Sequence, residues 1–277
     1  MQQKSILITG CSSGIGHDAA HTLKARGWRV FATCRAEVDC QRLRQEGLES
    51  YRLDYTDEAS IKSALASVVA ATSGQLDALF NNGAYAIPGA VEDLPRDAMR
   101  AIFEANFFGW LDLSNQVIPL MRRQGHGRIV NCSSVLGIVP MKWRGAYVAT
   151  KFALERITDT LRLELNGSGI IVVLIVPGPI RTQFRINARK EFERWIDWQN
   201  SALEPLYREK LLKRLYQAAE SGDRFESPPS AVSRKLILAL ESRSPKARYF
   251  VTLPTYFAEL MRRALPTRLS DMILGGN

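Results

Sequence analysis

Residues 5–16 read SILITGCSSGIG, a short apolar run that passes directly into a glycine-rich turn. The continuous apolar run is typical of a buried parallel strand. Residues 17–26 then have helical spacing, and Gly27 is the expected helix stop. Glycines let the backbone approach a pyrophosphate closely, and a helix start offers free N–H groups at its positive end. The stretch therefore predicts a phosphate-binding strand–turn–helix unit, with an ordinary tight turn as the alternative.

The rest of the chain repeats the alternation of strand and helix. Apolar runs that predict further strands lie at residues 28–33, 48–53, 78–80, 128–132 and 170–176, with 249–252 as a final or edge strand. This order predicts an α/β domain over residues 1–277, built on a doubly wound parallel sheet with helices on both faces. Residues 183–227 are expected to form a helical lid over a substrate pocket. Residues 253–277 read as an amphipathic tail.

Composition narrows the class of protein. The 277 residues suit one large α/β domain, and the net charge of +9 is spread without a basic block that would suit nucleic acid. Four cysteines without C-x-x-C spacing indicate a reduced, cytoplasmic location. We expect no leader peptide and no spanning helix.

The amphipathic tail, residues 253–277, is expected to pack on the domain or another subunit, with contact to a membrane surface as the alternative.

His17 and His21 lie four residues apart, a spacing that could hold a metal ion on one helix face. No acidic or cysteine partner accompanies them at ligand spacing. An exposed helix face is therefore the preferred interpretation, and we expect no metal.

Arg35 follows the strand predicted at residues 28–33, and no acidic residue occupies positions 33–35. In dinucleotide-binding folds an acid near this strand end holds the ribose hydroxyls, whereas an arginine accommodates a 2′-phosphate. The guanidinium also suits phosphate through its planar fork of donors. Arg35 therefore favours NADP(H) over NAD(H), with a solvated arginine as the alternative.

Tyr147 and Lys151 place a phenol and an ammonium four residues apart, on one face of a predicted helix. A lysine beside a tyrosine stabilises the phenolate, which makes the tyrosine a better acid near neutral pH. The pair predicts a proton donor if a cofactor accompanies it.

Asn106 lies inside a helix predicted at 96–123, where asparagine is a poor helix former. It is either a buried, hydrogen-bonded residue or a functional one.

In combination, these motifs resemble the short-chain dehydrogenase/reductase family over residues 4–252, which has a Rossmann-like fold. Its cofactor turn matches Thr9-Gly10-x-x-x-Gly14-Ile15-Gly16, and its Asn-Asn-Ala-Gly segment matches Asn81-Asn82-Gly83-Ala84 with the last two residues exchanged. The family's catalytic four match Asn106, Ser134, Tyr147 and Lys151, its nicotinamide-side motif matches Pro177-Gly178 with Thr182, and its adenine-contacting acid matches Asp54. Ser134 is chosen over Ser133 because the family's serine lies thirteen residues before the tyrosine. The exchange suggests a positive φ at Gly83. The motifs look most similar to the hydroxysteroid and retinol dehydrogenase-like branch.

The resemblance implies an NADP(H)-dependent oxidoreductase that interconverts a carbonyl and an alcohol. Ser134 and Tyr147 would hydrogen-bond the substrate oxygen, and Tyr147 would act as general acid/base. Lys151 would lower the pKa of Tyr147 and bind the nicotinamide ribose, and Asn106 would help link Lys151 to solvent. The implied cofactor-binding residues are Gly10, Ser12, Ser13, Gly14, Ile15, Gly16, Arg35, Asp54, Asn82, Tyr147, Lys151, Pro177, Ile180 and Thr182.

The substrate is expected to lie among Tyr85, Trp143 and Phe184. This aromatic lining suits a small apolar ketone, aldehyde or alcohol, whereas simple lid packing is the alternative role. The family resemblance also implies a homodimer or homotetramer, with contacts through the helix that carries Tyr147. The competing interpretation is a catalytically inactive dinucleotide-sensing protein on the same fold. The intact set of Ser134, Tyr147 and Lys151 favours the enzyme.

Overall fold

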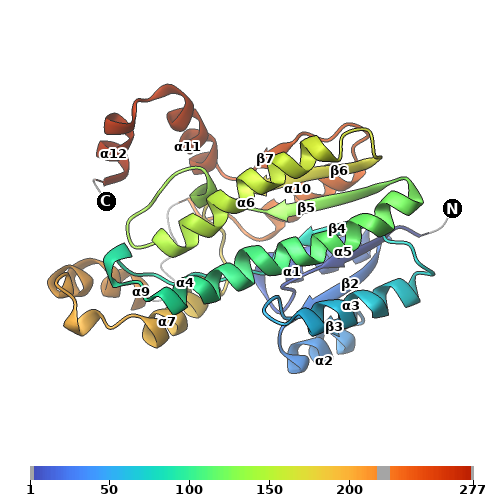
Figure 1. The fold of residues 1–277 in the computed structure, drawn as a ribbon, viewed down its shortest axis with the longest axis horizontal. Coiled ribbons are helices and arrows are strands. Elements are labelled where there is room, and N and C mark those ends of the chain that lie inside the picture. Colours follow the sequence, from blue (N-terminus) through green and yellow to red (C-terminus); the bar gives the residue numbers. More distant parts are fainter. Residues whose placement is uncertain (1–2, 217–224, 276–277) are drawn as a thin grey trace.

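Seven parallel strands form one sheet in the order β3-β2-β1-β4-β5-β6-β7 (Figure 1). The computed structural model describes residues 3–216 and 225–275. The strands are β1 Ser5–Ile8, β2 Arg29–Cys34, β3 Glu49–Arg52, β4 Ala78–Asn81, β5 Gly127–Cys132, β6 Ile170–Val176 and β7 Arg248–Phe250. The chain adds β2 and β3 on one side of β1 and then returns to place β4 on the other. The doubly wound parallel sheet that the sequence predicts is therefore confirmed.

Helices cover both faces of the sheet because its strands are apolar on both faces. Ile6 and Ile8 pack in one core cluster with residues of α1 and α10, whereas Leu7 packs in a second cluster with residues of α3 and α5. The helices around the sheet are α1 Gly14–Ala25, α2 Glu37–Gln45, α3 Glu58–Ala71, α5 Gly109–Gln124, α6 Gly145–Glu164 and α10 Ser230–Glu241. Successive strand residues thus serve opposite cores.

The region around Asn106 differs from the uninterrupted helix expected at residues 96–123. The helix α4 Arg96–Phe103 continues into a π-helical segment, Glu104–Phe108, before α5 begins. The Asn106 amide is fully buried and hydrogen-bonds the backbone of Tyr85 in both directions. A π-helical turn is an inserted irregularity that is common at functional sites, and here it carries an asparagine that bonds outside its own helix.

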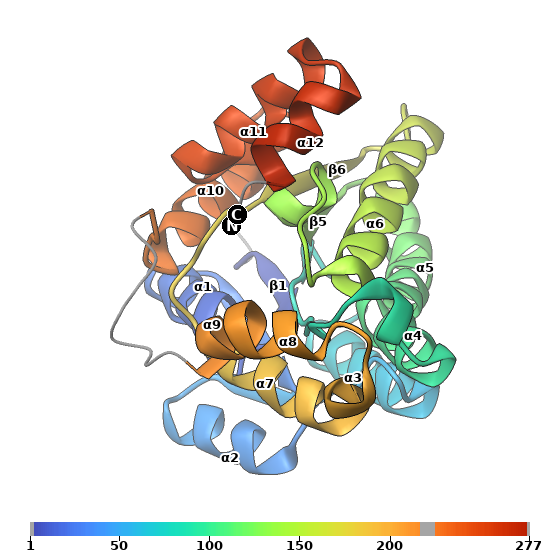
Figure 2. The same cartoon turned by 90° about the vertical axis from the view of Figure 1, so that its left-hand side faces the viewer.

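The lid consists of short helical pieces (Figure 2). They are α7 Phe184–Trp195, a 3₁₀ turn Trp198–Asn200, α8 Glu204–Leu206, a π-helical turn Tyr207–Leu212 and α9 Lys213–Tyr216. A core cluster that includes Phe192 and Tyr207 joins them to the loop after β4 and to α6. The Tyr207 hydroxyl donates to Asp93 of a 3₁₀ turn, Val91–Asp93, at 2.7 Å. Part of the predicted lid, residues 217–224, lies outside the described residues.

The tail consists of α11 Leu253–Ala264 and α12 Thr267–Gly275, which stand at the edge of the molecule beside α10 (Figure 2). Ala258 and Met261 anchor it against Val139 and Leu174. Leu253 and Leu260 on the opposite face of α11 are 78% and 64% exposed. None of the helices over residues 3–216 and 225–275 combines the length and apolar character that crossing a bilayer requires.

Candidate active site

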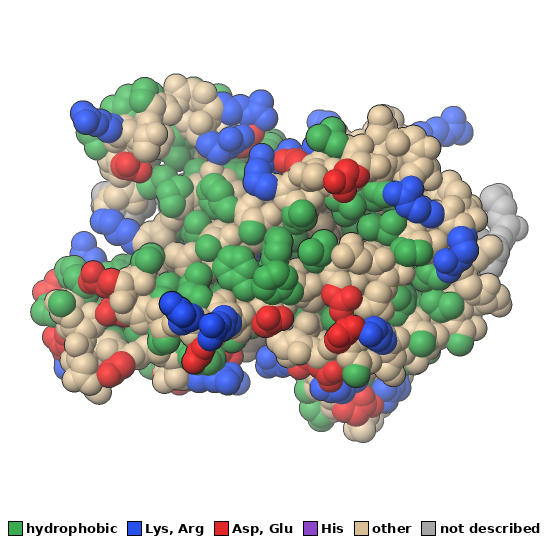
Figure 3. All heavy atoms as spheres, in the orientation of Figure 1, with side chains coloured by type: hydrophobic (Ala, Val, Ile, Leu, Met, Phe, Trp, Pro, Cys, Tyr) green, Lys and Arg blue, Asp and Glu red, His purple; other side chains and the backbone are tan. Residues whose placement is uncertain are grey.

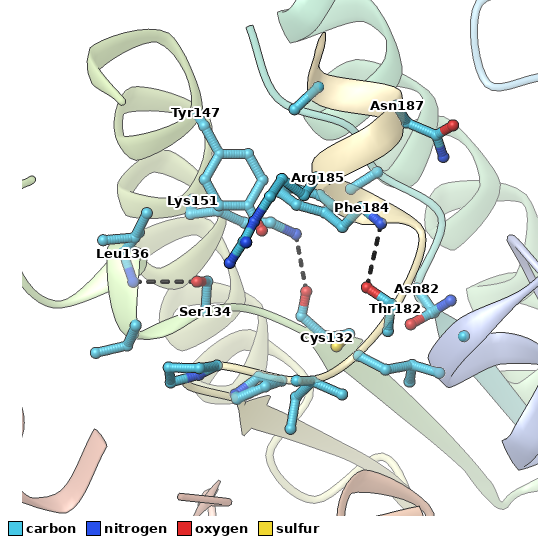
Figure 4. A pocket seen from close by; sticks show the side chains of 18 of the residues that line it. Asn82, Cys132, Ser134, Leu136, Tyr147, Lys151, Thr182, Phe184, Arg185 and Asn187 are labelled. Carbon is cyan, nitrogen blue, oxygen red and sulfur yellow. Dashed lines mark hydrogen bonds between the residues drawn. The ribbon is translucent and has the colours of Figure 1, made fainter. Parts of the chain in front are cut away.

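A cavity of about 360 Å³ opens at the carboxyl ends of the strands (Figure 4). It lies beside the point between β1 and β4 where the order of strands along the sheet reverses. Ligands of doubly wound sheets bind at such switch points. The sequence-predicted residues that line it are Gly10, Ser12, Ser13, Gly14, Ile15, Asn82, Ser134, Tyr147, Lys151, Pro177, Ile180, Thr182 and Phe184. Segments from residues 10 to 184 of the chain thus meet in one cavity, as the motif spacing predicts.

The glycine-rich turn has the geometry of a phosphate cradle. Gly10 and Gly14 have φ values of +68° and +59°, which disfavour side chains. A Cβ at Gly16 would lie 2.3 Å from the Gly10 carbonyl oxygen, and one at Gly14 would lie 2.8 Å from Thr182 Cγ2. The helix α1 begins at Gly14, and the Ser13 side chain does not cap it. Its first N–H groups are therefore available to an anion, so the turn fits a dinucleotide pyrophosphate.

Asn82 holds this turn from the neighbouring strand. Its Nδ2 donates to the carbonyl oxygens of Thr9 at 3.1 Å and Gly10 at 3.4 Å. Gly83 does not have the positive φ that the exchanged motif suggests. A Cβ at Gly10 would lie 2.5 Å from Gly83 Cα, so the close approach of the two segments requires glycine at position 10. A Cβ at Gly83 would meet Tyr55 Cε2 at 3.3 Å and Gly10 Cα at 3.4 Å, a tight fit without a clash of that size.

Tyr147 and Lys151 both lie on α6 and face the cavity, so the predicted helical pair is confirmed (Figure 4). Tyr147 is 7% exposed, and Lys151 is 1% exposed. Burial raises the pKa of the Tyr147 phenol, and the neighbouring Ser134 hydroxyl opposes this shift. Ser134 lines the same cavity, and its Oγ accepts from the Leu136 N–H at 3.1 Å. The phenol is protonated near neutral pH and can serve as a donor.

The Lys151 ammonium is held by a backbone carbonyl. Its Nζ donates to the Cys132 carbonyl oxygen at 2.8 Å and lies 4.3 Å from the centre of the Trp110 ring. Its distance to the Tyr147 ring centre is 5.6 Å. Burial lowers the pKa of Lys151 to about 8. The roles of Lys151 in lowering the Tyr147 pKa and in binding a nicotinamide ribose stay predictions.

Glu155 belongs to the same helix face but was not predicted. It lies one turn after Lys151, its side chain is fully buried, and Arg248 of β7 donates to its Oε2 at 3.0 Å. Burial raises the pKa of Glu155, and Arg248 opposes this rise. The spacing 147, 151, 155 was the signal that could have found it, since side chains four apart share a helix face. Glu155 also favours the charged form of Lys151.

Asn106 lies behind the cavity wall. Its Oδ1 accepts from the Tyr85 N–H at 3.1 Å, and its Nδ2 donates to the Tyr85 carbonyl at 2.8 Å and to Thr150 Oγ1 at 3.3 Å. Both interpretations of the sequence thus keep support: the amide is buried and hydrogen-bonded, and it fixes the loop after β4 against α6.

Two residues expected at the substrate lie outside the lining of the cavity as the described residues define it. The Trp143 ring meets the Tyr207 ring of the lid at a tilt of 53°, with ring centres 4.8 Å apart. Tyr85 packs in the same cluster. A substrate role for Tyr85 and Trp143 stays a prediction.

Phe184 does line the cavity, and its ring meets the Tyr147 ring edge-on at 5.3 Å. The remaining wall is less aromatic than expected. Leu136 and Met141 share it with the guanidinium-bearing residues Arg144, Arg185 and Arg214. Figure 4 shows Arg185 extending from the start of α7 into the cavity.

Arg35 and Asp54 lie at the carboxyl ends of neighbouring strands, Arg35 directly after β2 and Asp54 two residues after β3. Arg35 is exposed. Asp54 Oδ1 accepts hydrogen bonds from the N–H and hydroxyl of Thr56. Both residues lie outside the lining of the main cavity as the described residues define it.

Comparisons with known proteins agree with this geometry. The family model for short chain dehydrogenases matches residues 4–193. The chain belongs to the short-chain dehydrogenase family. An uncharacterized oxidoreductase, YbbO of Escherichia coli K12, is 40% identical over 276 residues, which cover 100% of this chain and 96% of that protein. Human retinol dehydrogenase 16 is 32% identical over 282 residues, covering 99% and 88% of the two chains.

A solved structure shares the fold. The short-chain dehydrogenase/reductase of Burkholderia phymatum in complex with NAD superposes with a TM-score of 0.79, covers 99% of this chain and 95% of its own, and is 24% identical. The chain is thus a short-chain dehydrogenase, an oxidoreductase whose cradle fits a dinucleotide.

The buried ammonium of this short-chain dehydrogenase should make its stability depend on pH. Lys151 has a pKa of about 8 in the folded chain, against an ordinary value of 10.5. Between these two pH values Lys151 is protonated in the unfolded chain and largely neutral in the folded chain. Raising the pH therefore increases the free energy of unfolding. Relative to Lys151→Met, wild type should gain up to about 1.4 kcal/mol per pH unit across this window. Urea denaturation without dinucleotide measures this difference, and a flat difference would contradict it.

Proposed function

We propose that this protein is an NADP(H)-dependent oxidoreductase that interconverts a carbonyl and an alcohol on a small substrate. The observation that carries the proposal is the meeting of Ser134, Tyr147 and Lys151 with the glycine-rich cradle in one cavity. A phosphate cradle alone would suit a sensor. A buried phenol beside a hydroxyl and an ammonium adds the groups that a proton transfer needs.

The residues present fit a nicotinamide dinucleotide. The turn from Gly10 to Gly16 would hold the pyrophosphate, and Asn82, Pro177, Ile180 and Thr182 would border the nicotinamide half. When bound, the nicotinamide supplies or accepts the hydride, which is the cofactor's own chemistry. The protein's task is then to orient the substrate and to manage one proton.

Tyr147 would hold and move that proton at its hydroxyl oxygen. Because burial keeps the phenol protonated, it can donate to a substrate oxygen on which negative charge develops. The Ser134 hydroxyl would hydrogen-bond the same oxygen and fix its position. Lys151, held by the Cys132 carbonyl, presents a cation next to the phenol and favours its deprotonated form after the transfer.

Replacing Tyr147 by phenylalanine should separate catalysis from binding. Without the hydroxyl, turnover should fall by about 10²–10⁴-fold, whereas dinucleotide affinity should stay nearly unchanged because the cradle is intact. The measurements are NADPH oxidation with a carbonyl substrate and NADPH fluorescence titration. Tyr256→Phe, an exposed tyrosine on α11, is the matched control. Wild-type rates in Tyr147→Phe would refute the role of this phenol.

The same experiment weighs the alternative function. A catalytically inactive dinucleotide sensor would bind NADPH but would turn over no member of a broad panel of ketones, aldehydes and alcohols. Turnover that depends on Tyr147 excludes this alternative, and its complete absence in wild type would support it.

NADP(H) is proposed over NAD(H) on the basis of Arg35. Its exposed guanidinium follows β2, and no acid stands between residues 33 and 35 to bind a free ribose hydroxyl. In Arg35→Ala the ratio of NADPH to NADH affinity should fall by about 10–100-fold, since one charge-assisted contact is lost. Arg123→Ala, another exposed arginine at the end of α5, should leave the ratio as in wild type. An unchanged ratio in Arg35→Ala would contradict the proposal.

For the substrate we infer an apolar body that carries an acidic group near its carbonyl. Leu136, Met141 and Phe184 offer the apolar wall, and Arg185 extends into the cavity from the lid. The Arg185 guanidinium lies 4.0 Å from Glu226, whose carboxylate also lines the cavity. The guanidinium has the planar fork that matches a carboxylate. The proposal keeps the apolar character expected from sequence and adds a charge preference.

A matched pair of ketones tests this inference: one with an ionised carboxylate and its methyl ester. Wild type should prefer the carboxylate, and Arg185→Met should lose at least about tenfold of that preference in kcat/KM. The ester rate should change little. Arg263→Met is the control, because Arg263 is 70% exposed on α11 and lies outside the cavity lining. An equal preference in wild type and Arg185→Met would count against this substrate class.

The cytoplasmic location, the single-domain organisation and the homodimer or homotetramer stay predictions. Figure 3 shows hydrophobic side chains gathered on the face that carries α5 and α6. Phe152 and Leu163 of α6 are 37% and 73% exposed. An apolar surface of this kind supports the proposed contact between subunits.

A further inference from the structure

Two histidines of α1 meet a glutamate from a distant part of the sequence. His17 Nε2 and His21 Nε2 each lie 2.8 Å from the same carboxylate oxygen, Oε2 of Glu46. The two rings are one helical turn apart, with centres at 4.5 Å. Glu46 follows directly on α2. The sequence offered no acidic partner for the histidines at ligand spacing, and the fold supplies one from 25 residues further along the chain.

We propose that His17, His21 and Glu46 form a binding site for a divalent transition-metal ion, with Zn²⁺ as the representative. Two imidazoles and a carboxylate are ligands that such ions accept. The ligand atoms of all three residues already lie within 4.8 Å of one another. Zinc bonds of about 2.0–2.2 Å place tetrahedral ligand atoms about 3.4 Å apart. Each nitrogen–oxygen pair therefore needs to open by only about half an ångström.

Metal binding requires the ring protons to move. As hydrogen-bond donors to the Glu46 carboxylate, the two rings carry a proton on Nε2. A metal bound through Nε2 requires the proton on Nδ1. In each ring the Nε2–H bond therefore breaks, solvent takes that proton, and Nδ1 takes one from solvent, so that a coordination bond replaces the hydrogen bond.

The orientation of Glu46 suits a ligating carboxylate. Its Oε2 lies 2.8 Å from both imidazole Nε2 atoms. Arg42 donates to Oε1 at 2.8 Å, which leaves Oε2 to the histidines. A fixed hydrogen bond to a ligating carboxylate is the usual way in which proteins orient such a ligand.

The site is reachable from solvent and separate from the active cavity. His17, His21 and Glu46 side chains are 33%, 38% and 28% exposed. Both histidines border a surface hollow on the outer side of the glycine-rich turn, lined also by Asp18 and Gln183. Water from this hollow can complete the coordination. Arg42 also donates to the Ser12 carbonyl at 2.6 Å, so the proposed site is connected to the cradle through one side chain.

Metal titration of the full chain without a polyhistidine tag tests the proposal. Co²⁺ should produce visible d–d absorption at one equivalent, and Zn²⁺ should displace it. All four cysteines are buried, so the Co²⁺ spectrum should lack a thiolate charge-transfer band. Zn²⁺ should also raise the Tm of the protein in a concentration-dependent manner, because it binds the folded state. The absence of stoichiometric Co²⁺ binding at millimolar metal would overturn the proposal.

Variants assign the ligands. His17→Ala, His21→Ala and Glu46→Gln should each weaken Co²⁺ and Zn²⁺ binding by at least about tenfold. The control is His126→Ala, which removes the third histidine, 57% exposed and paired with Asp77 far from this site. Loss of binding in His126→Ala alone, or wild-type affinity in His21→Ala, would refute the assigned ligands. NADPH turnover in the presence of EDTA should remain, since the catalytic residues lie in a different cavity.

Discussion

The close passage of two strand ends at the centre of the sheet is the constraint on which the rest of this structure depends. Gly10 after β1 lies so close to Gly83 after β4 that a Cβ on Gly10 would lie 2.5 Å from Gly83 Cα. Asn82 bonds the carbonyls of Thr9 and Gly10 across the gap. Trp110 of α5 adds a bond from its indole N–H to the Gly83 carbonyl at 2.7 Å. These contacts fix the switch point, and the cavity for cofactor and substrate lies directly above it.

Desolvation governs the chemistry on the other side of the cavity. The stripe of Tyr147, Lys151 and Glu155 buries a phenol, an ammonium and a carboxylate on one helix. Burial opposes the charged form of each, so the phenol keeps its proton, the ammonium holds its proton less firmly and the carboxylate depends on Arg248. Because burial penalises the phenolate, the resting form of Tyr147 is the protonated acid.

Much of this could be predicted because the signals are local. Apolar runs, glycine spacing and the four-residue interval from Tyr147 to Lys151 depend on the backbone periods of strands and helices. They located the parallel sheet, the cradle and the Tyr147–Lys151 pair. The surroundings of the aromatic residues could not be predicted in this way. Trp143 and Tyr85 carry no periodic signal that distinguishes a ligand wall from lid packing.

The sequence by itself determined the order of strands and helices, the phosphate cradle and the Tyr147–Lys151 pair, since each needs only residues near one another in the chain. Only the tertiary structure decided that the lysine binds the Cys132 carbonyl, that Arg185 enters the cavity and that Glu46 meets His17 and His21. These outcomes depend on which helices pack side by side and on how much water that packing removes. The spacing of residues along the chain encodes neither the packing of distant helices nor the loss of water that this packing causes.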